Sequence, residues 1–106
     1  MDPTVQHRKH QRYPVRFKSL FSTDGVHIED GLVLDLSLEG CRLTSTSHVS
    51  SGIPIEIHIR PDQYSPVYIP RAVVCWAGDS VFGLEFKEVP ELESATLTRL
   101  LCLLPS

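Results

Sequence analysis

The 106-residue sequence contains few cysteines and no long apolar run, and each scarcity argues against a class of protein. Cys41, Cys75 and Cys102 are odd in number and far apart, which disfavours a disulfide framework or a zinc site and predicts buried free thiols. No run of about 18 apolar residues could span a membrane, and the N-terminus lacks the apolar segment of a secretory signal. We therefore expect a cytoplasmic protein without a membrane span.

Motifs typical of catalysis and of metal binding are also missing. The sequence has no G-x-S-x-G element, no cysteine with a recognisable histidine partner, and no pair of carboxylates isolated in an apolar run. Its five histidines show no metal-type grouping beyond His7 and His10. We expect a binding protein with no enzymatic activity, no metal and no cofactor.

Positive charge is scarce overall but concentrated at the start of the chain. Residues 1–20 carry five Lys and Arg against one acid, a net charge of +4, so the rest must carry −7 to reach the formal net charge of −3. A general nucleic-acid binder would spread basic residues over its folded face and have a high isoelectric point, whereas this one is about 5.9. The basic segment predicts a small anionic ligand, and neither DNA nor RNA is expected as a partner.

Alternating apolar and polar residues predict six strands. The clearest alternation is in residues 53–60, where Ile55, Ile57 and Ile59 face inward. Asp24-Gly25 and Gly78-Asp79 are typical turn pairs, and Pro70 predicts a strand edge or a bulge. The other expected strands span residues 12–23, 31–37, 40–45, 67–78 and 80–89.

The expected strand at residues 31–37 matters most for function. Its alternation predicts that Leu32, Leu34 and Leu36 face the core and that Val33, Asp35 and Ser37 face outward. Trp76, the only tryptophan, is expected in the core at the end of its strand, and this strand is a candidate border of the ligand face.

The C-terminal segment changes to a helical period. Leu97, Leu100, Leu101 and Leu104 follow the spacing i, i+3, i+4, i+7, which predicts a helix whose leucines cap the open end of a small barrel or in part contact a partner. Six antiparallel strands of this length favour a closed or nearly closed all-β barrel. We therefore expect a flexible N-terminal arm at residues 1–12, a barrel at 13–89 and a helix within 90–106.

Two motifs carry a family resemblance. Arg8 and Arg12 have the spacing R-x-x-x-R, and residues 35–40 read D-x-S-x-x-G. In this order and distance, and with the closing VVCW and FGLEF segments, they resemble the PilZ domain, the bacterial receptor module for cyclic di-GMP. The resemblance covers nearly the whole chain and implies a six-stranded PilZ-like barrel, with cyclic di-GMP as its ligand.

The chemistry of the motif residues suits this ligand. An arginine fork can pair with phosphate, bond to guanine O6 and N7, or stack on a base. The Asp35 carboxylate can accept from guanine N1–H and N2–H, the Ser37 hydroxyl can donate or accept, and Gly40 removes a side chain where the backbone turns or approaches the ligand. In the resembled family the arm folds over a ligand on this face, which implies ligand contacts from Arg8, Arg12, Asp35, Ser37 and Gly40.

The expected mechanism is ordering of the arm by the ligand, with the reshaped surface read in trans by an unidentified effector protein. His7 stands where many members of the family carry another basic residue, so the number of bound ligands, one or an intercalated pair, stays open. Two other classes also stay open: a ligand-independent PilZ-like interaction subunit, and a small-barrel nucleic-acid binder with aromatic residues among basic ones.

Overall fold

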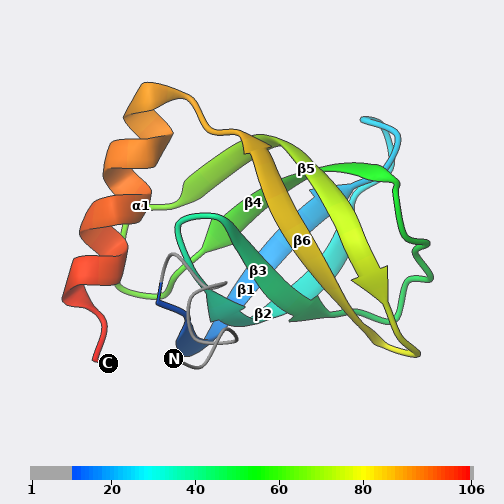
Figure 1. The fold of residues 1–106 in the computed structure, drawn as a ribbon, viewed down its shortest axis with the longest axis horizontal. Coiled ribbons are helices and arrows are strands. Elements are labelled where there is room, and N and C mark those ends of the chain that lie inside the picture. Colours follow the sequence, from blue (N-terminus) through cyan, green and yellow to red (C-terminus); the bar gives the residue numbers. More distant parts are fainter. Residues whose placement is uncertain (1–10, 106) are drawn as a thin grey trace, which may run out of the picture.

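The computed structural model describes residues 11–105 and has a closed barrel of six antiparallel strands followed by one helix (Figure 1). This architecture confirms the all-β fold predicted from the sequence. The strands are β1 (Tyr13–Ser22), β2 (Glu29–Leu36), β3 (Gly40–Thr44), β4 (Pro54–Arg60), β5 (Val67–Ala77) and β6 (Val81–Glu88).

The barrel closes in the order β1-β2-β3-β6-β5-β4, so β1 pairs with both β2 and β4. Closure gives every strand two hydrogen-bonded neighbours, which removes the exposed edges of an open sheet. Gly25, with φ of 77°, lies in the loop between β1 and β2 as the Asp-Gly pair predicts. Pro70 lies where the pairing of β4 with β5 changes register, which confirms the predicted bulge.

The helix α1 (Glu91–Leu103) stands beside one end of the barrel (Figure 1). It buries Leu97, Leu100 and Leu101 within the same apolar cluster as the strands, as their spacing predicts. The backbone N–H of Tyr68 in β5 donates to Glu93 of the helix at 2.7 Å, which adds a polar contact to this packing. Within residues 11–105, α1 is too short to cross a membrane, and no other helix is present there.

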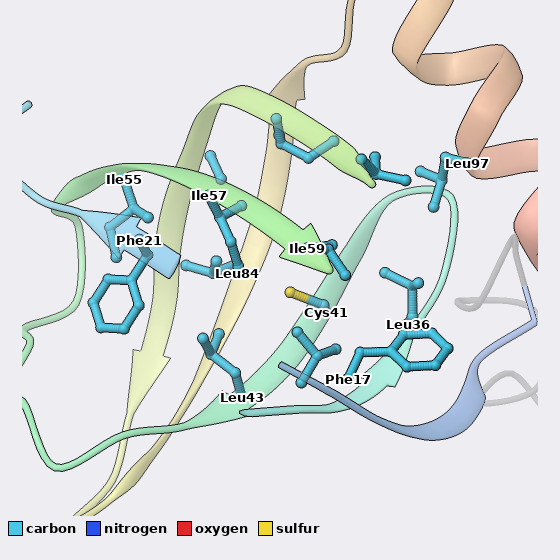
Figure 2. Packing of buried hydrophobic residues seen from close by; sticks show 14 of the residues in the cluster. Phe17, Phe21, Leu36, Cys41, Leu43, Ile55, Ile57, Ile59, Leu84 and Leu97 are labelled. Carbon is cyan, nitrogen blue, oxygen red and sulfur yellow. The ribbon is translucent and has the colours of Figure 1, made fainter. Parts of the chain in front are cut away.

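The barrel interior is filled by apolar side chains from all six strands (Figure 2). Ile55, Ile57 and Ile59 are at most 2% exposed, which confirms the inward face predicted for β4. Phe21 lies toward one end of the cluster and Leu97 toward the other, so the helix covers an end of the barrel rather than its side (Figure 2).

The strict alternation predicted for β2 is right for Asp35 and Leu36 but wrong for the three residues before them. Val33 and Leu36 are fully buried, whereas Leu34 and Asp35 are only partly buried. The cause is a β-bulge. Val33 pairs with Leu43 and Asp35 with the adjacent Arg42, so Leu34 has no partner in β3 and is the extra residue of the bulge. The bulge leaves Asp35 on the outer face and returns Leu36 to the core.

Two further burial predictions are wrong. Cys41 is buried as expected, but Cys75 and Cys102 are exposed. Trp76 is 45% exposed and lies outside the core, because β5 also changes register between Val74 and Trp76. In both strands the inserted residue shifts the pattern that the sequence alone would continue.

The three thiols should therefore differ in reactivity. Burial raises the pKa of the Cys41 thiol well above its ordinary value, so this residue stays protonated and out of reach of reagents. We expect Ellman's reagent to modify two thiols quickly in the folded protein and the third only in denaturant. The variant Cys41→Ala should keep both fast reactions, and a third fast thiol in the unmodified protein would contradict the burial of Cys41.

Candidate functional site

Asp35 accepts hydrogen bonds from two arginines, one just before β1 and one in β3. Its Oδ1 accepts from Nη1 of Arg12 at 2.8 Å, and its Oδ2 accepts from Nε of Arg42 in β3 at 3.0 Å. The Asp35 side chain is 17% exposed, against 33% for Arg12 and 44% for Arg42. One negative charge thus lies between two positive ones, which leaves a local positive excess at the surface.

Asp35 and Arg42 belong to a row of residues that crosses five strands. Pro14 pairs with Asp35, Asp35 with Arg42, Arg42 with Gly83, and Gly83 with Trp76. The residues on either side of Arg42 and of Gly83 in their strands are buried. Since side chains alternate along a strand, this row, called the Asp35 row below, lies on the outer face of the barrel.

The indole ring of Trp76 lies over Gly83. A Cβ at position 83 would collide with atoms Nε1 and Cε2 of the ring, so only glycine leaves room for it. Trp76 is 45% exposed, and its register neighbour Gly83 pairs on its other side with Arg42. The outer face therefore combines an aromatic ring, a guanidinium group and a carboxylate along the Asp35 row.

Ser37 does not share this outward face, and its predicted orientation is wrong. It lies just beyond the end of β2, is fully buried, and folds its hydroxyl into the turn that leads to β3. The hydroxyl accepts from the backbone N–H groups of Glu39 and Gly40, both at 3.2 Å, and donates to the carbonyl of Gly40 at 3.2 Å. Ser37 stabilises the turn that follows Asp35.

Gly40 has a packing role in the same turn. A Cβ on this residue would overlap the backbone carbonyl oxygen of Leu84 in the paired strand β6. The preceding residue, Glu39, accepts from the backbone N–H of Phe86 at 2.9 Å, which ties the turn to β6. Of the D-x-S-x-x-G motif, only the aspartate presents its side chain outward.

Of the five residues proposed from the sequence, the structure brings Arg12 and Asp35 into contact and places Ser37 and Gly40 in the adjoining turn. Arg8 lies outside the described residues, as do Lys9 and the other positions before residue 11, so their roles and the flexibility of the arm stay predictions.

Sequence reasoning gave Arg42 no role and assigned Trp76 to the core. The signal for Arg42 was its place between two apolar residues in the short strand after the motif, which predicts an outward side chain across from β2. For Trp76 no comparable signal exists, because the bulge that turns it outward follows from the register of β5 against β6.

Comparison with known families decides the identity of the fold. The model of the PilZ domain matches residues 6–102. The chain belongs to the PilZ domain family. PilZ domains are in general binding domains that act as effectors of cyclic di-GMP. Among the curated proteins none is similar enough in sequence to match.

Solved structures agree with this assignment at the level of the fold. One is the PilZ domain of CeSA from a cellulose-synthesizing bacterium, with 20% identity, a TM-score of 0.66, and coverage of 85% of this chain and 93% of that chain. Another is the Bacillus subtilis inhibitor of motility MotI/DgrA, with 18% identity and a TM-score of 0.73. The match covers 90% of this PilZ chain and 49% of MotI/DgrA.

Two adjoining hollows of this PilZ domain lie on a different face, between β1 and β4. Their volumes are about 370 and 810 Å³, and both are lined by Leu20, Arg60 and Pro66. The larger also includes Lys18, opposite Arg60 in the strand register, but adds the acidic Asp30 and Asp62. Because the charges are mixed, this face shows no clear preference for an anion, in contrast to the Asp35 row.

The PilZ motif glycine should be required for stability as well as for any ligand contact. Gly40→Ala forces β3 away from the Leu84 carbonyl, and we expect a loss of at least about 1–3 kcal/mol in the free energy of unfolding. Gly78→Ala is the matched control, because its Cβ would meet Val81 only at 3.4 Å and its φ is not positive. Thermal unfolding followed by circular dichroism measures both variants; equal melting temperatures would contradict the packing role of Gly40.

Proposed function

We propose that this protein is a non-enzymatic cyclic di-GMP receptor whose ligand lies on the Asp35 row and is covered by the N-terminal arm. The observation that carries the proposal is the contact between Arg12 and Asp35. These residues are 23 positions apart and belong to the two motifs that carry the family resemblance, yet the fold joins their side chains at 2.8 Å. The root of the arm therefore lies beside the carboxylate to which we assign guanine binding, at the outer face of the barrel.

Binding requires an exchange of partners at Asp35. Both carboxylate oxygens already accept from arginines, so a guanine edge gains access when Arg12 releases Oδ1. An ion pair that is partly open to solvent contributes only about 0–1 kcal/mol, so release of Asp35 by Arg12 costs little. The bonds that Arg12 then makes to a phosphate, and Asp35 to guanine, compensate for this cost.

The arm and the remaining residues of the Asp35 row suit the phosphates and the bases of a cyclic dinucleotide. Arg8 and Arg12 provide forks for the phosphates. Trp76 is 45% exposed, and its ring, which lies over Gly83, offers a surface on which a guanine stacks. The site then combines stacking, charge pairing and a base-reading carboxylate, with Ser37 and Gly40 holding the turn after Asp35.

Output passes to another protein. Ordering one backbone residue costs about 1–2 kcal/mol, so an arm of several residues becomes ordered only when its arginines gain ligand contacts. The ordered arm and ligand create a surface that an effector protein binds in trans. We place the receptor in the cytoplasm, where a cyclic dinucleotide messenger is encountered. A ligand-independent interaction subunit is the alternative, in which the Arg12–Asp35 pair only anchors the start of β1.

Replacing either motif arginine should weaken the binding of cyclic di-GMP. Arg8→Ala and Arg12→Ala each remove a contact worth about 1–3 kcal/mol, so we expect the dissociation constant to rise about tenfold to a hundredfold. Lys9→Ala is the matched control, with the same loss of charge and a much smaller effect. Isothermal titration calorimetry of each variant with cyclic di-GMP measures the change.

Three outcomes would count against this assignment. Equal losses for all three variants would show that only net charge matters. A wild-type protein that does not bind cyclic di-GMP at all would favour the ligand-independent subunit. Binding of single-stranded RNA in preference to cyclic di-GMP, at equal concentration in a filter-binding assay, would favour the nucleic-acid binder.

A further inference from the structure

Arg42 holds a fixed position beside Asp35 that the family motifs do not explain. Its Nε donates to Asp35 Oδ2 at 3.0 Å, and the two residues are direct register partners in β2 and β3. Among residues 11–105, Nε is the only atom of the Arg42 guanidinium with a protein hydrogen bond, so its two terminal amino groups have no protein acceptor there. The side chain is 44% exposed.

The surroundings of Arg42 leave room for a ligand. Its partner on the other strand is Gly83, which has no side chain, and Trp76 lies across that glycine. The carboxylate fixes one edge of the planar guanidinium, so the remaining N–H donors are oriented before any ligand arrives. An acceptor and a set of donors thus stand side by side on the outer face.

We propose that Arg42 is a specificity-determining residue that reads guanine together with Asp35. The Watson–Crick edge of guanine presents the donors N1–H and N2–H beside the acceptor O6. Asp35 accepts from the donors, and Arg42 donates to O6. Adenine presents the reverse order, an acceptor at N1 and a donor at N6, so it would meet a carboxylate with an acceptor and a guanidinium with a donor.

Arg42 also explains how Asp35 stays in place during partner exchange. When Arg12 leaves Oδ1 for the ligand, Arg42 still donates to Oδ2 and keeps the carboxylate in its orientation. Oδ1 is then free to accept from a ligand, while the terminal amino groups of Arg42 are free to donate to it. This inference rests on the proposed function, since it concerns the base preference of the same site.

The test compares the affinities of cyclic di-GMP and cyclic di-AMP in three variants, by calorimetry. The ratio of the two affinities is the readout, because a change in net charge affects both ligands alike. We expect Arg42→Ala to reduce the preference for cyclic di-GMP about tenfold to a hundredfold. Arg42→Lys keeps the charge but not the planar guanidinium that can bond Asp35 and guanine at the same time. It should therefore also reduce the preference for cyclic di-GMP. Arg71→Ala, which removes an exposed arginine of β5 paired with Glu88, should leave the ratio unchanged.

The outcomes separate this inference from the proposed function. If the wild-type protein binds neither ligand, the proposed function is overturned and the inference with it. If the wild-type protein prefers cyclic di-GMP and Arg42→Ala keeps that ratio, only the inference is overturned. Circular dichroism checks that each variant is folded, and if Arg42→Ala is not, an unchanged ratio in Arg42→Lys overturns the inference instead.

Discussion

A single carboxylate shared by two guanidinium groups connects the fold of this protein to its proposed function. Asp35 bonds Arg12, at the root of the basic arm, and Arg42, on the neighbouring strand. Neither contact is deeply buried, so release of Asp35 by Arg12 would cost little free energy. The positive excess of this cluster attracts an anion to a protein whose net charge is negative.

The barrel supplies the rigidity that such an exchange needs. Leu36, next to Asp35, is fully buried, and Ser37 and Gly40 fix the turn that follows through hydrogen bonds and close packing against β6. A β-bulge at Leu34 turns Asp35 outward. The residues of the D-x-S-x-x-G motif therefore have different roles: the aspartate faces the outer surface that we propose for the ligand, whereas the serine and the glycine hold the turn beside it.

The fold could be predicted from sequence because its signals are local. The isoleucines of β4 and the leucines of α1 repeat at the periods of a strand and a helix, and burial follows those periods. The orientation of Trp76 could not be predicted in this way, since it follows a register shift in the pairing of β5 with β6. Nor could that of Ser37, whose hydroxyl folds into the turn after β2. Arg42 was overlooked because its proposed role depends on its cross-strand neighbours Asp35 and Gly83, and the pairing of β3 with β2 and β6 places these beside it.

The central claim, that the ligand surface is the outer face around Asp35, is tested most directly by a titration of the ¹⁵N-labelled protein with cyclic di-GMP followed by NMR. The account predicts that the amide signals of Asp35, Arg42 and Gly83 and the indole signal of Trp76 shift with ligand concentration. The signals of Lys18 and Arg60, which line the hollow between β1 and β4, should stay in place. Shifts confined to that hollow, or an unchanged spectrum, would contradict the account.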